Sequence, residues 1–392
     1  MRVLYSFPQR LGAGRICIIP WHQMVGLAAA GAEVTALVGS IERDPGANVS
    51  CRATLCPGGV KIPFRLLGMN LVNAIHDYRT ASWLSINYGK IDIVHGWPSA
   101  SLRTIKIARQ HGIPFVLERP NAHTAFAYEE VAAECKRLDF SLPRDHDHSW
   151  NAALLRHEER EYASTDYLIC PSEFVAQTFR ERNFNESKLL RHRYGYDPTR
   201  FSPATERIQS PGINMVYAGV CYPRKGLHYA LEAWINSTAS KTGQFKICGE
   251  FVEGYEEKLG SMLAHPSVKV MGHRNDLPEL FRSADLFVLP SVEEGSALVT
   301  YEARASGCVL LVSDRAGAVC EHQVDSLIHD ARDVDALTSH ISLLADNPGI
   351  LARLRENSMA TILELTWSRA GRILLDCYQM ALERRGISTS RY

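Results

Sequence analysis

Short apolar runs alternate with longer amphipathic segments through the first half of the chain. Apolar runs that end at glycine, proline or polar residues are typical of strands buried on both faces of a parallel sheet. Apolar positions three or four residues apart predict helices between these strands. The predicted strands are residues 2–7, 33–38, 91–95, 114–118 and 167–170, and the predicted helices are 15–30, 62–75, 101–111 and 150–164. The alternation predicts βαβ units, and therefore a parallel α/β domain.

The same alternation restarts at residue 213, after a polar segment rich in turn residues at 191–212. We interpret that segment as a linker between two Rossmann-like domains. The second set of predicted strands is 213–219, 245–248, 268–271, 286–289 and 309–312. The predicted boundaries are 1–200 for the amino-terminal domain, 201–365 for the carboxyl-terminal domain and 366–392 for a helix that packs back on the first domain.

One strand–loop–helix–strand unit of the second domain, residues 285–314, carries two carboxylates, Glu294 and Glu302. Its first apolar run ends at a proline, and Ser296 is the predicted N-cap of a helix that continues to Ser306. The loop and the helix N-terminus then lie at the carboxyl edge of a parallel sheet, where phosphorylated ligands bind. Because a carboxylate repels phosphate, the expected partners of the two acids are sugar or ribose hydroxyls. The pattern indicates a nucleotide-sugar site.

Three other loops carry candidate site residues. Lys225 follows a predicted strand and precedes a predicted helix, so its ammonium can reach a phosphate bound at the same sheet edge. His123 follows a strand of the first domain, in a loop that can face the second domain across a cleft. The first loop of the chain contains Gly14 but has Cys17 where a dinucleotide-binding fingerprint has its third glycine. That loop is either a tight turn or part of a ligand site.

Charge and composition narrow the choice of function. Lysine plus arginine and aspartate plus glutamate are both 43, so the net charge gives no global electrostatic argument for nucleic-acid binding. The ten cysteines are scattered without a Cys-x-x-Cys pair, which suits a reducing compartment. The first residues predict a strand rather than a signal peptide, and no apolar run reaches the length of about 18 residues that spans a membrane. We expect a cytoplasmic protein.

Two segments have alternative interpretations. Residues 62–75 have helical spacing with Arg65 among apolar residues, which suits a core-packed helix or, less favoured, a helix on a membrane surface. Residues 145–148, Asp-His-Asp-His, have side chains that suit a divalent ion. They follow no buried strand, so a polar loop is the favoured interpretation and no metal site is expected there.

The run Pro290-Ser-x-x-Glu294-Gly-x6-Glu302-Ala, with a glycine at 307, resembles the signature of the retaining GT-B glycosyltransferases of glycosyltransferase family 4. Weaker matches to the same family lie at Gly12, Gly14, residues 92–95, His123, Thr124, Lys225, Gly226, Gly249, Gly272 and Trp367. The resemblance covers most of the chain. It implies the GT-B fold, in which two Rossmann-like parallel-sheet domains face each other across a cleft.

The resemblance also implies an activity. Members of the family transfer a hexose from a nucleoside-diphosphate sugar to an acceptor, usually without a metal or other cofactor, with retention of configuration. The implied acceptor is a glycan or a lipid-linked oligosaccharide in polysaccharide biosynthesis, which adds peripheral contact with the inner face of the membrane. The implied catalytic residues are His123, Lys225 and Glu294, and the implied donor-binding residues are Gly14, Arg224, Lys225, Gly249, His273, Ala297, Leu298, Val299 and Glu302.

By resemblance, Lys225 would bind the diphosphate, Glu302 the ribose hydroxyls, and the backbone amides of residues 297–299 phosphate oxygens. Glu294 and His123 would lie near the transferred hexose. One position departs from the family, because Val220 stands where an arginine is usual, and Arg224 is the residue that could reach the same phosphate. Two alternatives remain, a sugar-nucleotide 2-epimerase of the same fold and a non-catalytic sugar-nucleotide-binding protein.

Overall fold

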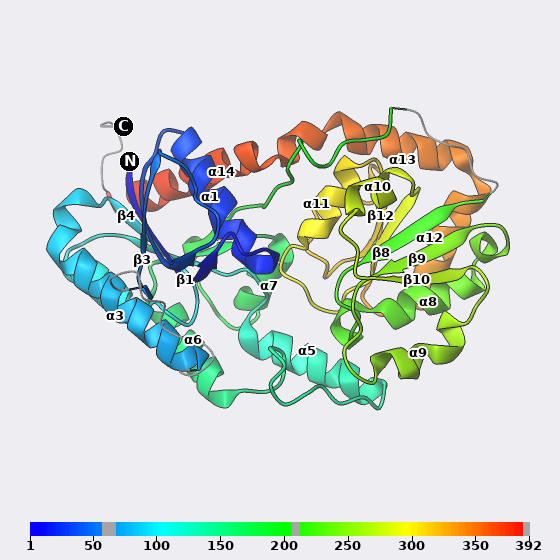
Figure 1. Ribbon diagram of the computed structural model, residues 1–392, viewed down its shortest axis with the longest axis horizontal. Helices are drawn as coiled ribbons and strands as arrows, with labels where there is room; N and C mark the ends of the chain where they lie inside the picture. The colour runs from blue at the N-terminus through cyan, green and yellow to red at the C-terminus, as the bar shows by residue number, and fades with distance from the viewer. Residues whose placement is uncertain (57–67, 206–211, 387–392) are drawn as a thin grey trace.

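Two parallel sheets organise the part of the chain that the structure, a computed structural model, describes: residues 1–56, 68–205 and 212–386. The amino-domain sheet has seven strands in the order β3-β2-β1-β4-β5-β6-β7, and the carboxyl-domain sheet has six in the order β10-β9-β8-β11-β12-β13. The two domains lie side by side (Figure 1). The predicted architecture of two parallel α/β domains is confirmed.

The elements of the amino domain alternate along the chain. Its strands are β1 (Arg2–Leu11), β2 (Glu33–Ile41), β3 (Val49–Ala53), β4 (Ile93–Gly96), β5 (Phe115–Glu118), β6 (Tyr167–Cys170) and β7 (Leu189–Arg191). Its helices are α1 (Ile18–Ala29), α3 (Met69–Asn87), α4 (Leu102–Gln110), α5 (Thr124–Arg137), α6 (Ala152–Ser164) and α7 (Glu173–Arg180), and short 3-10 turns lie at Arg15–Cys17, Tyr88–Lys90 and Glu186–Lys188.

The carboxyl domain repeats this arrangement. Its strands are β8 (Asn214–Ala218), β9 (Gln244–Cys248), β10 (Val268–Gly272), β11 (Leu286–Leu289), β12 (Val309–Ser313) and β13 (Ser326–His329). Its helices are α8 (Leu227–Asn236), α9 (Tyr255–Leu263), α10 (Leu277–Arg282), α11 (Leu298–Ala305), α12 (Val334–Asp346) and α13 (Pro348–Ala360), with 3-10 turns at Pro223–Lys225, Thr238–Lys241 and Ile362–Leu365. The last helix, α14 (Trp367–Glu383), lies beside α1 in the amino domain (Figure 1).

Alternating side chains of β1 divide the amino-domain core into two layers. Tyr5 and its alternate neighbours pack into a cluster with α1 and α14, whereas Leu4 packs into a second cluster with α3, α4, α6 and α7. Successive side chains of a strand point to opposite faces of a sheet, so a strand that is buried on both faces is apolar at every position. The helices therefore cover both faces and leave the carboxyl edge of the sheet free to build a site.

Some elements differ from the sequence-based prediction. β1 continues past Phe7 through Pro8 to Leu11, because its pairing with β2 shifts register between Phe7 and Arg10 and so accommodates a proline that cannot donate to the ladder. The pattern predicted no element at β3, β7, β13 or α5. Polar residues interrupt or end the apolar run in each of the three strands, and the α5 sequence mixes charged and apolar residues too evenly to show a clear apolar stripe.

The helix predicted at 62–75 corresponds to the start of α3, which begins at Met69 and continues to Asn87; positions 62–67 lie outside the described residues. Its inner face buries Val72 and Leu84, and buried Asp77 accepts hydrogen bonds from backbone amides at the start of α4. Within the described part of the predicted segment, Val72 and Asn73 are buried, whereas Met69 and Leu71 are exposed. No helix in the described ranges has the length and apolarity needed to cross a membrane.

The chain crosses between the domains at two adjacent places. The first crossing, at Tyr196, forms a parallel bridge with the second, at Thr366. After the second crossing α14 packs against α1, where Gly371 and Gly26 come so close that a Cβ on Gly371 would lie 2.5 Å from Gly26 backbone atoms. Tyr378 of α14 extends this contact with a 2.5 Å hydrogen bond to His95 at the end of β4.

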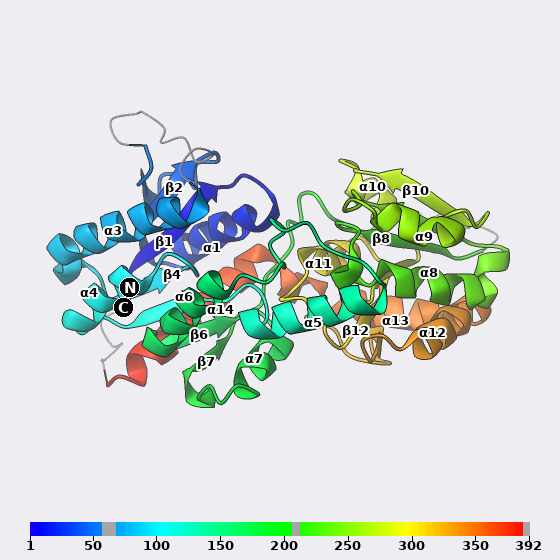
Figure 2. The same cartoon turned by 90° about the horizontal axis from the view of Figure 1, so that it is seen from below.

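Helix α5 forms a third connection, because it extends from the amino domain to the carboxyl domain (Figure 2), where it contacts the turn Pro223–Lys225 and the start of α8. Glu134 of α5 accepts a 2.7 Å hydrogen bond from Arg332 and lies 2.9 Å from a ring nitrogen of His228. Glu130, one turn earlier, pairs with Arg315 and Arg332. Two glutamates of the amino domain are thus neutralised by cations of the carboxyl domain.

Candidate active site

Three loops meet between the carboxyl edges of the two sheets. The loop after β11 lies against the loop after β5, and a Cβ on Gly295 would be 1.6 Å from the carbonyl oxygen of Pro120. Ser172, after β6, donates a 2.6 Å hydrogen bond to the carbonyl oxygen of Gly295. Only glycine leaves room for this approach. The stretch predicted to hold a sugar nucleotide therefore lies at the junction of the domains.

Two cations and two carboxylates lie together at the ends of β8 and β11. Arg224 donates from Nε to Glu293 over 2.5 Å and from Nη2 to Glu294 over 3.1 Å. The ammonium of Lys225 contacts the second carboxylate oxygen of Glu294. Gly226 has a φ of 68°, and a Cβ there would lie 2.0 Å from a backbone oxygen at the end of β11. Glycine thus allows the loop after β8 that carries Arg224 and Lys225 (the cation loop) to approach the loop after β11 that carries Glu293 and Glu294 (the acid loop).

Burial and charge act against each other in this cluster. Burial alone would raise the pKa of Glu294, but Arg224 and Lys225 outweigh burial and hold that pKa below its usual value. Burial lowers the pKa of Lys225, an effect that Glu294 opposes. Burial also disfavours the charge of Arg224, but the two adjacent glutamates raise its pKa well above the usual value. This acid–cation cluster consists of two positive side chains and two negative ones, Arg224, Lys225, Glu293 and Glu294. It therefore has no net charge before a ligand arrives.

Ser296 does not cap the following helix, which corrects the sequence-based prediction. Its hydroxyl lies 2.8 Å from the hydroxyl of Tyr301 and is used there. The N-cap position of α11 is Ala297, and no side chain caps this terminus. The helix N-terminus is consequently electropositive and has backbone amides at residues 297–299 that suit phosphate oxygens.

Glu302 lies on α11, inside the helix whose N-terminus borders the acid–cation cluster. Its side chain is half-buried. Burial raises its pKa to about 7, an effect that Arg200 partly opposes. Near neutral pH the side chain is therefore close to the midpoint between an acceptor-only carboxylate and a neutral acid.

His123 is placed at the junction, but its ring points into the amino domain. Nδ1 accepts a 3.2 Å hydrogen bond from the amide of Ala125, so the side chain caps α5. The ring packs against Tyr162 and Phe179, with centroid distances of 5.2 and 5.0 Å. Burial, with help from Arg119, lowers the pKa of His123 to about 3. The imidazole is therefore neutral at pH 7.

The other candidate residues are distributed along both sheet edges. Gly249 follows β9 and touches the loop after β8, since a Cβ there would lie 1.8 Å from the carbonyl oxygen of Gly219. His273 is exposed after β10, which β9 separates from β8. Gly14 has a φ of 78° and open space around the position of a Cβ. Val220 is 40% exposed at the rim of the cation loop. The structure brings Arg224, Lys225, Glu294 and Gly249 to neighbouring loops, and leaves His273 two strands from β8.

The Asp-His-Asp-His segment at 145–148 lies over the cation loop. The rings of His146 and His148 lie 5.1 and 6.0 Å from the ring of Tyr222, and His148 Nε2 is 3.8 Å from Glu293. In the described ranges no three His, Cys, Asp or Glu side chains converge as a metal site would require. The segment instead brings two amino-domain imidazoles to the carboxyl-domain side of the junction.

Two residues at the junction were not singled out from the sequence: Glu293 and Tyr222. Glu293 is fully buried, and its carboxylate accepts hydrogen bonds from Arg224 and from the amide of Ala122. The adjacent position of Glu293 and Glu294 in the sequence was the available signal. Both acids contact Arg224, and only the packing shows that Glu293 also meets the amino domain.

Comparisons with known proteins identify the family and the fold. The profile of the family described as "Glycosyltransferase Family 4" matches residues 22–200, and that of "Glycosyl transferases group 1" matches residues 212–347. A UDP-Gal:alpha-D-GlcNAc-diphosphoundecaprenol alpha-1,3-galactosyltransferase of Escherichia coli is 31% identical over 66% of this chain and 67% of its own length.

Two further relatives match shorter segments. One is an N,N'-diacetylbacillosaminyl-diphospho-undecaprenol alpha-1,3-N-acetylgalactosaminyltransferase of Campylobacter jejuni, 33% identical over 25% of this chain and 27% of its own length. The other is an MMP alpha-(1->4)-mannosyltransferase of Mycolicibacterium hassiacum, 29% identical over 48% of each chain. The match to these two relatives thus spans a quarter to a half of their length.

Solved structures share the fold over almost the whole chain. Sucrose-phosphate synthase from Thermosynechococcus elongatus superposes with a TM-score of 0.70 at 16% identity, over 98% of this chain and 99% of that one. The lipopolysaccharide glycosyltransferase WaaG superposes with a TM-score of 0.58 at 17% identity, over 99% and 100% of the two chains. At these identities the likeness shows the two-domain architecture alone.

Proposed function

Since the chain belongs to glycosyltransferase family 4, the group 1 glycosyltransferases with the GT-B fold, we propose that it transfers a hexose from a nucleoside-diphosphate sugar, with retention of configuration. The acid–cation cluster beside the α11 N-terminus is the observation that carries the proposal. It puts Lys225 and Arg224 next to free helix amides, which suits a diphosphate, and puts Glu294 at the same point for a sugar hydroxyl.

The proposed mechanism follows from where charge develops. The bond from the anomeric carbon to the diphosphate oxygen breaks, and the electron pair leaves with the diphosphate. Lys225, Arg224 and the α11 amides stabilise that negative charge in a site enclosed between the domains. The acceptor oxygen bonds to the anomeric carbon on the same face, and its proton passes to the departing phosphate oxygen. We propose that these cations serve in place of a metal ion.

Glu302 and Glu294 receive separate roles in this proposal. Glu302 accepts hydrogen bonds from the ribose hydroxyls, because it lies further along α11 than the amides proposed for the phosphates. Glu294 faces the hexose once the diphosphate has taken its place beside Lys225. The buried ring of His123 supports a role in shaping the amino-domain wall near the sugar rather than proton transfer, since its Nδ1 already caps α5.

The proposed acceptor is a glycan or a lipid-linked oligosaccharide. The names of the E. coli and C. jejuni relatives both specify a diphosphoundecaprenol-linked sugar. The outer face of the amino domain supports peripheral membrane contact. There α3 exposes Leu71, Tyr78 and Ile86, with Ile86 81% exposed.

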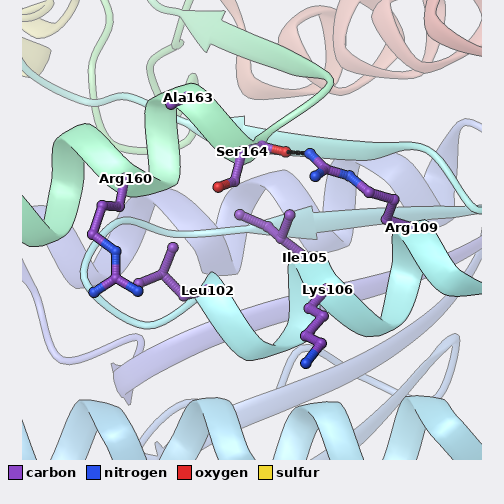
Figure 3. A pocket seen from close by; sticks show the side chains of 7 residues that line it. All are labelled: Leu102, Ile105, Lys106, Arg109, Arg160, Ala163 and Ser164. Carbon is purple, nitrogen blue, oxygen red and sulfur yellow. Dashed lines mark hydrogen bonds between the residues drawn. The ribbon is translucent and has the colours of Figure 1, made fainter.

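The neighbouring helix α4 adds positive charge to that face. It carries Arg103, Lys106 and Arg109 and no acidic residue, and the guanidinium of Arg103 lies 5.9 Å from the centre of the Tyr78 ring. Lys106 and Arg109 also line a pocket that α4 forms with Arg160 of α6 (Figure 3). Exposed apolar side chains beside clustered cations suit an anionic lipid surface.

A ligand screen tests the donor assignment. We expect one series among UDP, GDP and ADP sugars and their nucleoside diphosphates to raise the melting temperature. We expect Lys225→Ala to lose that shift and to slow release of nucleoside diphosphate from the stabilising donor at least about a hundredfold, or 2.7 kcal/mol. Lys269→Ala, at an exposed position of the edge strand β10, is the matched control. A flat response of the wild-type protein to all three series would overturn the proposal.

A further inference from the structure

The side chain of Glu293 is enclosed at the point where the two domains touch. It is fully buried, and its carboxylate contacts both domains. Oε2 accepts a 2.5 Å hydrogen bond from Arg224 of the carboxyl domain, and Oε1 accepts a 3.2 Å hydrogen bond from the backbone amide of Ala122 in the amino domain. A buried carboxylate is stable only with such partners, so its position depends on both domains being in place.

Arg224 is held rigidly by this arrangement. Its Nε donates to Glu293, its Nη1 donates to the hydroxyl of Tyr222 over 3.0 Å, and its Nη2 donates to Glu294 over 3.1 Å. The planar guanidinium therefore has a fixed direction beside Lys225. If Glu293 moves, Arg224 loses both a charged partner and the contact that orients its Nε edge.

The amino-domain side of the contact is a close backbone approach. Pro120 and Ala122 belong to the loop after β5, and Pro120 lies against Gly295, two residues after Glu293. The ring of His148 covers Glu293 from the same domain. Burial lowers the pKa of His148 well below its usual value, so the ring adds no charge and Arg224 remains the balancing cation. Separation of the domains would expose Glu293 to water and remove the amide of Ala122 from it.

We propose that Glu293 is a positioning residue that orients Arg224 at the donor phosphates only while the two domains are closed on each other. Contact between the β5 loop and Glu293 thereby makes the phosphate site complete. The acceptor-side domain thus influences catalysis without touching the donor. The catalytic part of this inference rests on the proposed glycosyltransferase function, whereas the contact between the domains does not.

Three substitutions separate the two parts of the role. Glu293→Gln keeps the shape but removes the charge that orients Arg224. Glu293→Asp keeps the charge but withdraws the carboxylate by one methylene, away from the amide of Ala122. Asp325→Asn is the matched control, because Asp325 pairs over 2.7 Å with another buried arginine, Arg304, and this pair lies within the carboxyl domain.

Two measurements, steady-state kinetics and amide hydrogen exchange, test the proposal. For both Glu293 variants we expect kcat to fall about tenfold or more while the donor KM changes less than about threefold, because the proposed role of Arg224 is to stabilise the charge that develops as the diphosphate leaves. We expect amide hydrogen exchange of the peptide that spans 119–123 to become faster in both Glu293 variants. Asp325→Asn should lower the melting temperature without either effect.

The outcomes are distinguishable. Unchanged exchange at 119–123 in both Glu293 variants overturns the interdomain contact, and so does an equal increase in Asp325→Asn. Wild-type kcat in both Glu293 variants, or an equal loss in the control, overturns the positioning role. If the wild-type protein binds no nucleoside diphosphate, the proposed function fails, and the exchange measurement still decides whether Glu293 joins the domains. Glu293→Asp retains a partner for Arg224 and so keeps the test usable if Glu293→Gln does not fold.

Discussion

At the scale of single residues, the site is built from charges that neutralise one another before any ligand binds. Glu294 contacts both Arg224 and Lys225, where a diphosphate is proposed to bind. The carboxylate therefore occupies the place of the phosphate charge, and it must release Lys225 when the donor arrives. This exchange of carboxylate for phosphate beside Lys225 gives Glu294 opposite effects on the affinity for the nucleotide and on the rate of turnover.

The exchange predicts that Glu294→Gln binds the nucleoside diphosphate about tenfold more tightly than the wild-type protein, because the amide neither competes for Lys225 nor repels phosphate. Turnover should fall in the same variant, since the group that faces the hexose is lost. Isothermal titration with the nucleotide selected by the thermal screen measures the affinity. Glu257→Gln, on the exposed surface of α9, should leave it unchanged, and weaker binding by Glu294→Gln would contradict the exchange.

A second prediction concerns Glu302, whose pKa is raised to about 7 by burial. A carboxylate accepts from both ribose hydroxyls, so nucleotide affinity should be about tenfold lower at pH 6 than at pH 8, following the ionised fraction. The pH dependence should disappear in Glu302→Gln. Titration of nucleotide binding across this pH range is the measurement, and equal pH profiles of the two proteins would exclude Glu302 as the group responsible.

The raised pKa of Glu302 also makes the stability of the ligand-free protein depend on pH. The folded protein holds the Glu302 proton up to about pH 7, whereas an unfolded chain releases it near the usual glutamate value. Glu302 therefore lowers the free energy of unfolding of the ligand-free protein progressively as the pH rises between these two values. Relative to the wild-type protein, Glu302→Gln should gain stability with rising pH over that interval and show no further change above it.

At the scale of elements, helices α3 and α4 form an outer surface that packs against neither sheet. The inner faces of both helices pack on the amino-domain core, while α3 leaves Leu71, Tyr78 and Ile86 exposed beside the cations of α4. Water does not favour such apolar exposure, so the surface suits a partner that combines apolar and anionic character.

We expect the protein to co-sediment with vesicles that contain phosphatidylglycerol and to bind pure phosphatidylcholine weakly. Binding should fall at high salt because the attraction to anionic headgroups is screened. Tyr78→Glu and Ile86→Glu should each reduce binding several-fold. Leu363→Glu, at a residue 74% exposed outside this surface, should not. Equal loss of binding in all three variants would show that the α3 surface has no special role.

At the scale of the whole molecule, the second crossing of the chain joins the domains more tightly than a single linker could. Helix α14 belongs by sequence to the carboxyl half but packs on α1 in the amino domain. Gly26 and Gly371 allow the two helix backbones to meet, and Tyr378 reaches His95 beneath them. The placement of one domain relative to the other is thus constrained by contacts far from the acid–cation cluster.

Gly371→Ala should therefore destabilise the protein, because the added methyl group would meet Gly26 backbone atoms and force the helices apart. Such overpacking costs about 1–3 kcal/mol, which corresponds to a fall in melting temperature of at least about 2 °C. Differential scanning calorimetry measures the change. Gly349→Ala in α13, where no atom lies within 4 Å of the new methyl group, should melt at or above the wild-type temperature. An unchanged melting temperature in Gly371→Ala would contradict the close approach.

The sequence alone was sufficient for features that depend on neighbours along the chain. The two parallel α/β domains and the family could be predicted because buried parallel strands are apolar throughout and are separated by helical spacing. Lys225 and Glu294 could be placed at one sheet edge because each follows a strand, and the carboxyl ends of parallel strands lie together. Strands β3, β7 and β13 were missed because polar residues interrupt or end their apolar runs.

Only the tertiary structure decided in which direction each side chain points and what it meets. The ring of His123 turned into the amino domain because Tyr162 and Phe179 enclose it, and Ser296 bonded to Tyr301 instead of capping α11. Glu293, to which the sequence assigned no role, became the acid shared by both domains through the approach of Ala122. Local pattern determined which loops form the site, because it records burial and chain direction. The roles within those loops depended on contacts between residues far apart in the chain, which only packing brings together.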